Sequence, residues 1–192
     1  MYSLLKHCAE KLNRNIITLE DPVERKNQSI LQIQVNEKSG LSYAAGLKAI
    51  LRHDPDIIMI GEIRDSDTAQ IAVRAALTGH LVFSTIHARH SVGCLHRLHD
   101  LGVSYEDMSQ TLIAISAQKI IPVFRELGHL QPSYRALYEI LHGERLMDAL
   151  DLAKDKKLYT LPEHLSFSGQ IREGVRIGAI EASVQSQSNP YS

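Results

Sequence analysis

The sequence has no tryptophan, only two cysteines and almost no net charge. Cys8 and Cys94 lie far apart and form no C-x-x-C pair, so neither a disulfide framework nor a cysteine zinc site is indicated. The formal charge of −1, with Lys and Arg scattered along the chain, provides no extended field for nucleic acid or an anionic membrane. We therefore expect contact with DNA to be indirect.

Long hydrophobic runs are also absent. No apolar stretch approaches the ~18 residues of a membrane span, and no signal-peptide pattern is present. We expect no direct membrane insertion, and a cytoplasmic protein that reaches a membrane only through partners. The apolar fraction of 44% is that of an ordinary globular chain.

The sequence does contain short apolar strands that alternate with amphipathic helices. Helical spacing or strand-like alternation of apolar residues assigns each segment. The expected strands are 16–19, 31–35, 57–60, 80–88 and 135–143, and the expected helices are 1–13, 41–53, 65–79, 92–102, 104–120 and 144–153. This alternation predicts an α/β protein with a mostly parallel sheet and helices on both faces.

Polar side chains follow three of the expected strands. Glu20, Asp21 and Glu24 follow the first, Glu62 follows 57–60, and His87 lies at the end of 80–88. Ligands of open parallel sheets sit outside the carboxyl ends of the strands, and carboxylates gathered there suit hydrated Mg²⁺ with phosphates. The alternative is that each acid is a solvated strand end.

Three motifs in this region carry a family resemblance. "ITLEDPVE", "LRHDPDIIMIGEIRD" and "GHLVFSTIHA" resemble the Asp box, Walker B motif and His box of GspE/PulE-like type II/type IV secretion and pilus traffic ATPases. The similarity runs from Met1 to about Lys119. It implies a partial RecA-like P-loop NTPase core that works as a ring hexamer with ATP and Mg²⁺. The expected domains are this core (1–119), a small α-rich C-terminal subdomain (120–182) and a disordered tail (183–192).

The resemblance also implies roles for individual residues. Glu62 corresponds to the Walker B glutamate, which acts on Mg²⁺, directly or through water, or on the attacking water. Glu24, which closes the Asp box, corresponds to the second catalytic carboxylate, with Glu20 and Asp21 as supporting positions. Arg64 corresponds to the arginine after the Walker B glutamate, which can hold a neighbouring acid. These roles suit phosphoryl transfer, which needs positioning and charge neutralisation.

The histidines allow several readings. By resemblance, His80 and His87 are the His-box residues that sense the γ-phosphate, whereas His80 at a strand start can instead bond a neighbouring carbonyl. The His87/His90 and His96/His99 pairs have the i, i+3 spacing of metal ligands, but no Glu follows the first histidine as in H-E-x-x-H. We therefore expect no zinc site, and a small metal-binding protein is the reading outside this family.

The phosphate loop of such ATPases, G-x-x-x-x-G-K-[ST], does not occur in the sequence. The family usually reads "GKTTT" directly ahead of a segment like "MYSLL", so we expect Met1 to follow the loop on the helix that the loop initiates. The strand that feeds the loop is expected beside strand 57–60. The chain is then part of an intact ATPase or a hydrolytically inactive, truncated remnant that acts only in subunit association. In both cases we expect no ATPase activity of the chain alone.

The C-terminal third narrows the resemblance further. It lacks the four-cysteine zinc loop of many type II secretion members, and "RALYEIL" with the short ending is similar to ATPases of competence pseudopili in Gram-positive bacteria. The function this implies is assembly of a competence or type II-like pseudopilus, for DNA uptake or protein secretion, against an inner-membrane platform protein. A pilus retraction ATPase is the competing assignment.

Overall fold

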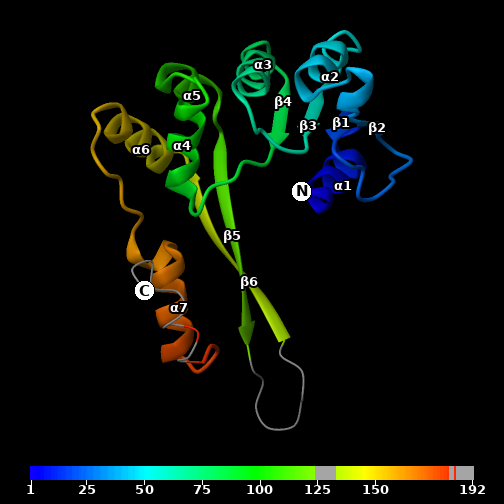
Figure 1. The fold of residues 1–192 in the computed structure, drawn as a ribbon. Helices are drawn as coiled ribbons and strands as arrows, with labels where there is room; N and C mark the ends of the chain where they lie inside the picture. The colour runs from blue at the N-terminus through cyan, green and yellow to red at the C-terminus, as the bar shows by residue number, and fades with distance from the viewer. Residues whose placement is uncertain (124–132, 182–183, 185–192) are drawn as a thin grey trace. The chain divides into compact units, whose positions relative to one another are not determined.

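The computed structural model describes residues 1–123, 133–181 and 184, which form two compact units (Figure 1). Unit 1 comprises residues 1–87 and 96–112, and unit 2 comprises 88–95 together with the described part of 113–192. Residue 119, where we expected the core to end, lies within a strand of unit 2. Each unit has a hydrophobic core of its own.

Unit 1 is built on a four-stranded parallel sheet. Its strands are β1 (Ile16–Glu20), β2 (Leu31–Gln34), β3 (Ile57–Ile60) and β4 (Leu81–Ser84), in the order β2-β1-β3-β4. Every residue of β1 and β3 is buried, as expected for central strands that are covered on both faces. The prediction of a mostly parallel α/β sheet is therefore confirmed.

The position expected for the missing strand is wrong. β3 pairs with β1 on one side and with β4 on the other, so no place is left beside it. The sheet has two edge strands among the described residues, β2 and β4, and the four residues of β4 are only half-buried. The mistake arose because strand order cannot be read from the order of motifs along the chain.

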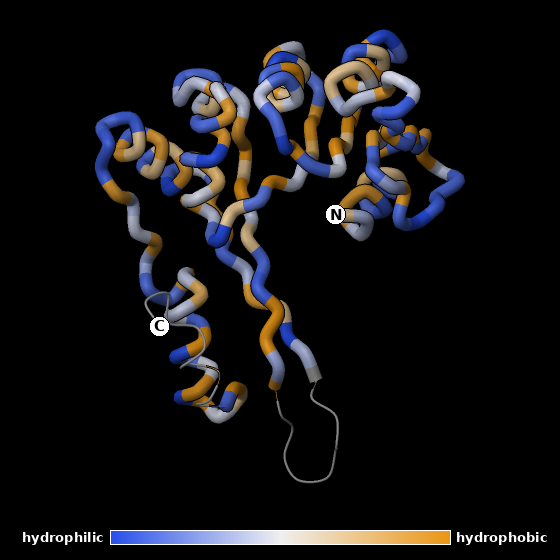
Figure 2. The backbone as a smooth tube through the Cα atoms, in the orientation of Figure 1, coloured by the Kyte–Doolittle hydropathy of each residue, from blue (hydrophilic) through white to orange (hydrophobic). Residues whose placement is uncertain are grey.

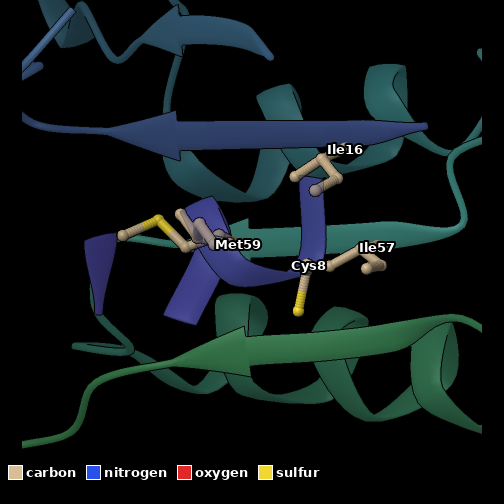
Figure 3. Close-up of a cluster of buried hydrophobic side chains, with 5 residues drawn as sticks. Cys8, Ile16, Ile57 and Met59 are labelled. Atoms are coloured by element: carbon tan, nitrogen blue, oxygen red, sulfur yellow. The ribbon is translucent and has the colours of Figure 1, made fainter. Parts of the chain in front are cut away.

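Helices cover the two faces of this sheet. α1 (Tyr2–Leu12) places Leu5 and Cys8 on Ile16 and Ile57 (Figure 3). Because side chains alternate along a strand, Leu19 points to the opposite face, where it lies against Gly46 of α2 (Tyr43–Ile50). Figure 2 shows apolar residues concentrated along the strands and mixed along the helices.

The other helices of unit 1 begin close to the expected positions, although α5 is shorter than expected. Ser42 caps α2 and Asp65 caps α3 (Ser66–Leu77), each accepting a backbone N–H from the first turn. Gly79 has φ +94, the left-handed conformation that ends a helix at low cost. Ser104 caps α5 (Tyr105–Thr111), and α4 (Ser91–Asp100) contributes residues to both units. A short 3₁₀ turn, η1 (Glu37–Ser39), precedes α2.

Unit 2 contains a long antiparallel hairpin, β5 (Ala114–Val123) with β6 (Ser133–His142). The expected helix 104–120 is therefore wrong beyond Thr111, because the ten-residue pairing with β6 takes over the following segment. The helices are α6 (Glu144–Lys154), which was expected, and α7 (Phe167–Arg176), preceded by the 3₁₀ turn η2 (Glu163–Leu165).

The core of unit 2 joins the hairpin to α7 and to the end of the described chain. Ile121 and Val123 of β5 pack with Ile171 of α7, and Ile180 and Val184 belong to the same cluster. Val184 is thus buried, although it lies in the tail that we expected to be disordered. The rest of that tail, apart from this position, lies outside the described residues.

Candidate functional site

The carboxyl ends of β1, β3 and β4 meet at one edge of the sheet because the three strands are parallel and in register. Glu20 is the last residue of β1, Glu62 follows β3 by two residues, and His87 follows β4 by three. The segments after β3 and β4 are tied together by two hydrogen bonds. Ile63 N–H donates to the Thr85 carbonyl at 2.9 Å, and Thr85 Oγ–H donates to the Gly61 carbonyl at 2.6 Å.

Glu62 lies at the centre of the site, with a side chain that is 16% exposed. Its Oε1 accepts a hydrogen bond from the Arg64 guanidinium, and its Oε2 accepts one from His87 Nε2 at 3.2 Å. The Arg64 hydrogen bond, with a further contribution from His87, lowers the pKa of Glu62 below its ordinary value. Glu62 is therefore ionised throughout the physiological pH range.

Arg64 links Glu62 to the end of the neighbouring strand. A guanidinium nitrogen of Arg64 lies 3.9 Å from the Asp21 carboxylate, directly after β1. Its hydrogen bond to Glu62 raises the pKa of Arg64, so the side chain stays charged. The structure thus brings Asp21, Glu62, Arg64 and His87 together, and we call these four residues the carboxylate cluster.

Glu20 is buried, 3% exposed, and both of its carboxylate oxygens are engaged. It accepts hydrogen bonds from the Tyr2 hydroxyl, from Thr18 Oγ at 2.6 Å and from Gln32 Nε2 at 2.9 Å. These three neutral donors come from α1, β1 and β2. The carboxylate therefore fastens the start of α1 to the sheet, and its oxygens are occupied by protein donors.

Glu24 is exposed in the loop that follows β1. Within the described part of the chain its carboxylate has neither a hydrogen bond nor an ion pair. The loop itself is held in place, because Gln32 Nε2 donates to the Arg25 carbonyl at 3.0 Å. The Tyr2 hydroxyl is also close to the backbone of Glu24 and Arg25. Glu24 thus has a free carboxylate on an anchored loop, and its catalytic role stays a prediction.

A cavity of about 390 Å³ adjoins this loop, between α1 and residues 25–29. Lys6, Arg25 and Lys26 contribute to its walls, together with the polar side chains of Ser3 and Asn27. Glu10 also lines the cavity and forms an ion pair with Lys6 at 3.7 Å. The volume falls within the range of small-molecule sites, and the remaining excess of positive charge favours an anionic ligand.

His80 lies apart from the cluster, at the amino end of β4. Its Nδ1 is 2.9 Å from the Ala75 carbonyl and 3.1 Å from Thr78 Oγ, so the contacts are those of the alternative reading at a strand start. The four residues of β4, at ~3.3 Å per residue, separate it from the edge that carries His87. Its role in nucleotide sensing stays a prediction without support from these contacts.

The His-x-x-His pairs have other partners. His90 Nδ1 accepts the Gly93 N–H at 3.0 Å, and the His99 ring stacks on Tyr105 with 4.5 Å between centroids. Among residues 1–123, 133–181 and 184, no group of three or more His, Cys, Asp or Glu side chains is arranged to hold a metal ion.

Hydrated Mg²⁺ needs less than such a group. It is usually bound through one or two carboxylates, with waters and substrate phosphates completing the shell. The chemistry of the donor set fits this pattern, because Asp21 and Glu62 offer only oxygen. These two residues would hold a hydrated Mg²⁺ ion through one or two carboxylates.

Sequence reasoning missed one residue of the site. Tyr43, at the start of α2, was not among the expected site residues, yet burial and then the charges of Asp21 and Glu62 raise its pKa to about 12. The available signal was a hydroxyl on an otherwise apolar helix face, which requires a polar surrounding when it is buried.

Comparison with known proteins decides the family. The model of the type II/IV secretion system protein family matches residues 1–149. This chain belongs to that family. The match covers all three motifs of unit 1 and extends through β5 and β6 into α6.

Individual members of this secretion family agree with the match. The chain is 43% identical to the competence protein ComGA of Bacillus subtilis over 189 residues, which is 93% of this chain and 52% of that protein. It is 44% identical to the type II secretion system protein E of Aeromonas hydrophila over 159 residues, 83% of this chain and 30% of that protein. The chain spans about half the length of the first and less of the second.

A solved structure supports the fold. The pilus retraction motor PilT, crystallised with bound ADP, aligns with 98% of this chain and 56% of its own, with a TM-score of 0.81 and 28% identity. The chain thus has an α/β fold similar to part of that motor. None of the helices within the described ranges has the length and apolarity needed to cross a membrane.

Proposed function

We propose that this chain carries the carboxylate half of the active site of a ring-forming traffic ATPase. ATP hydrolysis in the ring drives assembly of a competence or type II-like pseudopilus, in DNA uptake or protein secretion. The observation that carries the proposal is the carboxylate cluster, in which Asp21, Glu62, Arg64 and His87 converge from three parallel strands. Membership in the secretion family supplies the context.

The cluster fits water positioning better than strong base catalysis. A carboxylate with a lowered pKa is a weak base, so Glu62 orients the attacking water and accepts its proton late in the reaction. Arg64 keeps Glu62 and Asp21 from repelling each other across the site. Bound Mg²⁺ supplies charge neutralisation for the phosphates. Glu24 approaches from its anchored loop as the second carboxylate.

His87 is suited to report the state of the nucleotide. Its side chain is 89% exposed and is held by Glu62 at 3.2 Å. A γ-phosphate oxygen competes with Glu62 for the same Nε2–H, so binding and hydrolysis switch the partner of His87. This exchange provides a link between chemistry and movement of the segment that follows β4.

The remaining assignments follow from the secretion family. We propose self-association into a hexameric ring, an inner-membrane platform protein as partner and a cytoplasmic position at the inner face of the membrane. The 43% identity to the Bacillus competence protein favours the competence branch over a retraction motor, because the identity to PilT is 28%.

A hydrolytically inactive association module is the second candidate. The absence of G-x-x-x-x-G-K-[ST] from the sequence favours it, since the chain by itself has no phosphate cradle. The two candidates therefore differ in whether the cluster supports turnover once a cradle is provided.

The test supplies that cradle. Residues 1–192 are joined to the preceding part of the Bacillus subtilis competence protein, which contributes a phosphate loop, and phosphate release is measured. We expect ATP turnover, and we expect Glu62→Gln to lower kcat by roughly 10²-fold or more.

Glu106→Gln is the matched control. Glu106 is exposed on α5, where its side chain accepts a hydrogen bond only from Gln110, so its substitution leaves turnover unchanged. Absence of turnover in a folded, hexameric joined chain supports the association module instead.

A further inference from the structure

Tyr43 places a hydroxyl group beside Gly61, the residue immediately before Glu62. Its side chain is 6% exposed, at the first residue of α2. A Cβ atom added to Gly61 would lie 2.8 Å from the Tyr43 hydroxyl oxygen and 3.3 Å from the Leu19 carbonyl. The hydroxyl thus occupies the space that glycine leaves open immediately before Glu62.

This hydroxyl has no hydrogen-bond partner in the part of the chain that the structure describes. The oxygen is nevertheless not sealed, because no fully buried side-chain oxygen or nitrogen there lacks a partner. The ring is therefore enclosed while its polar tip opens to the site. Buried tyrosines usually find a protein partner for this group, so an open tip near Asp21 and Glu62 indicates an exogenous partner.

The surroundings of the Tyr43 hydroxyl determine which kind of external group it can bind. Burial, followed by the charges of Asp21 and Glu62, raises the pKa of Tyr43 to about 12. The phenol therefore keeps its proton at every physiological pH and can both donate and accept a hydrogen bond. An anionic oxygen at this position would face the carboxylates, whereas a water molecule can donate to them and accept from the phenol.

We propose that Tyr43 is a ligand-facing residue of this site, whose hydroxyl hydrogen-bonds a water molecule held beside Glu62 and Asp21. The inference rests on the proposed ATPase function, in which this water is either the attacking nucleophile or part of the Mg²⁺ hydration shell. Gly61 is required beside it, because any side chain there displaces the hydroxyl.

Stability separates this role from a structural one. The hydroxyl makes no hydrogen bond within the described chain, so Tyr43→Phe removes no intramolecular interaction and keeps the buried ring. We expect the Tm of the 192-residue variant to equal or exceed that of the parent chain. A clear fall in Tm assigns the hydroxyl to folding and overturns the proposal.

Kinetic measurements then test whether the water bound by Tyr43 takes part in the reaction. In the chain joined to the Bacillus phosphate-loop segment, we expect Tyr43→Phe to lower kcat roughly 5- to 10-fold with KM for ATP within about twofold. The affinity for the transition-state analogue MgADP–aluminium fluoride falls by the same factor, and that for MgADP is unchanged. Tyr105→Phe removes a hydroxyl from α5 instead and changes none of these values.

A second experiment does not depend on ATP turnover. It measures Mn²⁺ binding to the 192-residue chain by electron paramagnetic resonance. A hydration-shell water predicts affinity about threefold weaker in Tyr43→Phe, with Glu62→Gln as the positive control. If the joined chain is active and Tyr43→Phe changes neither kcat, nor the analogue affinity, nor the Mn²⁺ affinity, this inference is overturned. The ATPase proposal then still stands. A joined chain without turnover overturns the ATPase proposal, and the Mn²⁺ comparison then decides on Tyr43 by itself.

Discussion

At the scale of single residues, the site is organised by which oxygens are already engaged. Both carboxylate oxygens of Glu20 accept hydrogen bonds, from Tyr2, Thr18 and Gln32, while Glu24 has neither oxygen engaged within the described chain. Both are acids of one motif, yet their surroundings give one a structural task and leave the other available for chemistry.

The Arg64–Glu62 pair predicts a pH dependence of stability. The pKa of Glu62 is lower in the folded chain than its ordinary value of 4.5, so its stabilisation is present above that value and is lost as pH falls through the lowered pKa. Arg64→Met removes the main cause of the lowered pKa. We expect the difference in unfolding free energy between parent and variant to be largest at neutral pH and to shrink below pH ~4.5.

Urea unfolding at a series of pH values checks this prediction. Arg52→Met is the control, since Arg52 is exposed and takes part in no ion pair of the described chain. A difference that stays constant from pH 7 to pH 3 contradicts the assignment of the pKa shift to Arg64.

At the scale of elements, one buried carboxylate joins two helix starts in unit 2. Glu139 of β6 is 5% exposed and accepts the Ser91 N–H at 3.2 Å and the Phe167 N–H at 3.0 Å, at the first residues of α4 and α7. The unpaired N–H groups and partial positive charge of helix starts favour an anion there. Glu139 therefore stabilises the hairpin and both helices together.

We expect Glu139→Gln to lower the unfolding free energy by ~2–3 kcal/mol, because the amide offers one acceptor oxygen and turns a donor toward an N–H. Hydrogen exchange of the Ser91 and Phe167 amides should accelerate with it. Glu144→Gln, at the exposed start of α6, costs under ~1 kcal/mol. Unchanged protection of both amides contradicts the bridging role.

The elements also show how far sequence reasoning extends. The buried strands β1 and β3 and the capped helices α2 and α3 were predictable, because apolar runs, Ser42, Asp65 and Gly79 act locally. β5 was not, because its strand conformation depends on pairing with β6, a separate segment of the chain. Pro122 is tolerated there because a two-stranded hairpin has only edge strands.

The candidate site likewise has features that the sequence predicts and features that it does not. Strand ends in a parallel sheet are predictable, so the meeting of Asp21, Glu62 and His87 followed from the motifs. Two features of the site were not predictable: which acid is hydrogen-bonded by protein donors, and the approach of Tyr43 to Gly61 from a different element. Both depend on how segments that are distant in the sequence pack together.

At the scale of the whole molecule, the 192-residue chain carries acids without a phosphate cradle. We expect the purified chain to release phosphate from ATP at less than roughly 1% of the rate of the joined chain, because positioning of the phosphates is lost. A malachite-green assay at matched concentrations checks this. Turnover by the chain alone that is abolished by Glu62→Gln contradicts it.

The path of the chain through α4 sets a limit on dissection. Residues 88–95 belong to unit 2 and residues 96–112 return to unit 1, so the backbone passes from one unit to the other more than once. A protein shortened after residue 112 keeps Ser91 but discards the carboxylate that receives its amide. Isolating either unit for crystallography or spectroscopy therefore requires its separate stretches of chain to be joined by new linkers. A single stop codon cannot produce either unit intact.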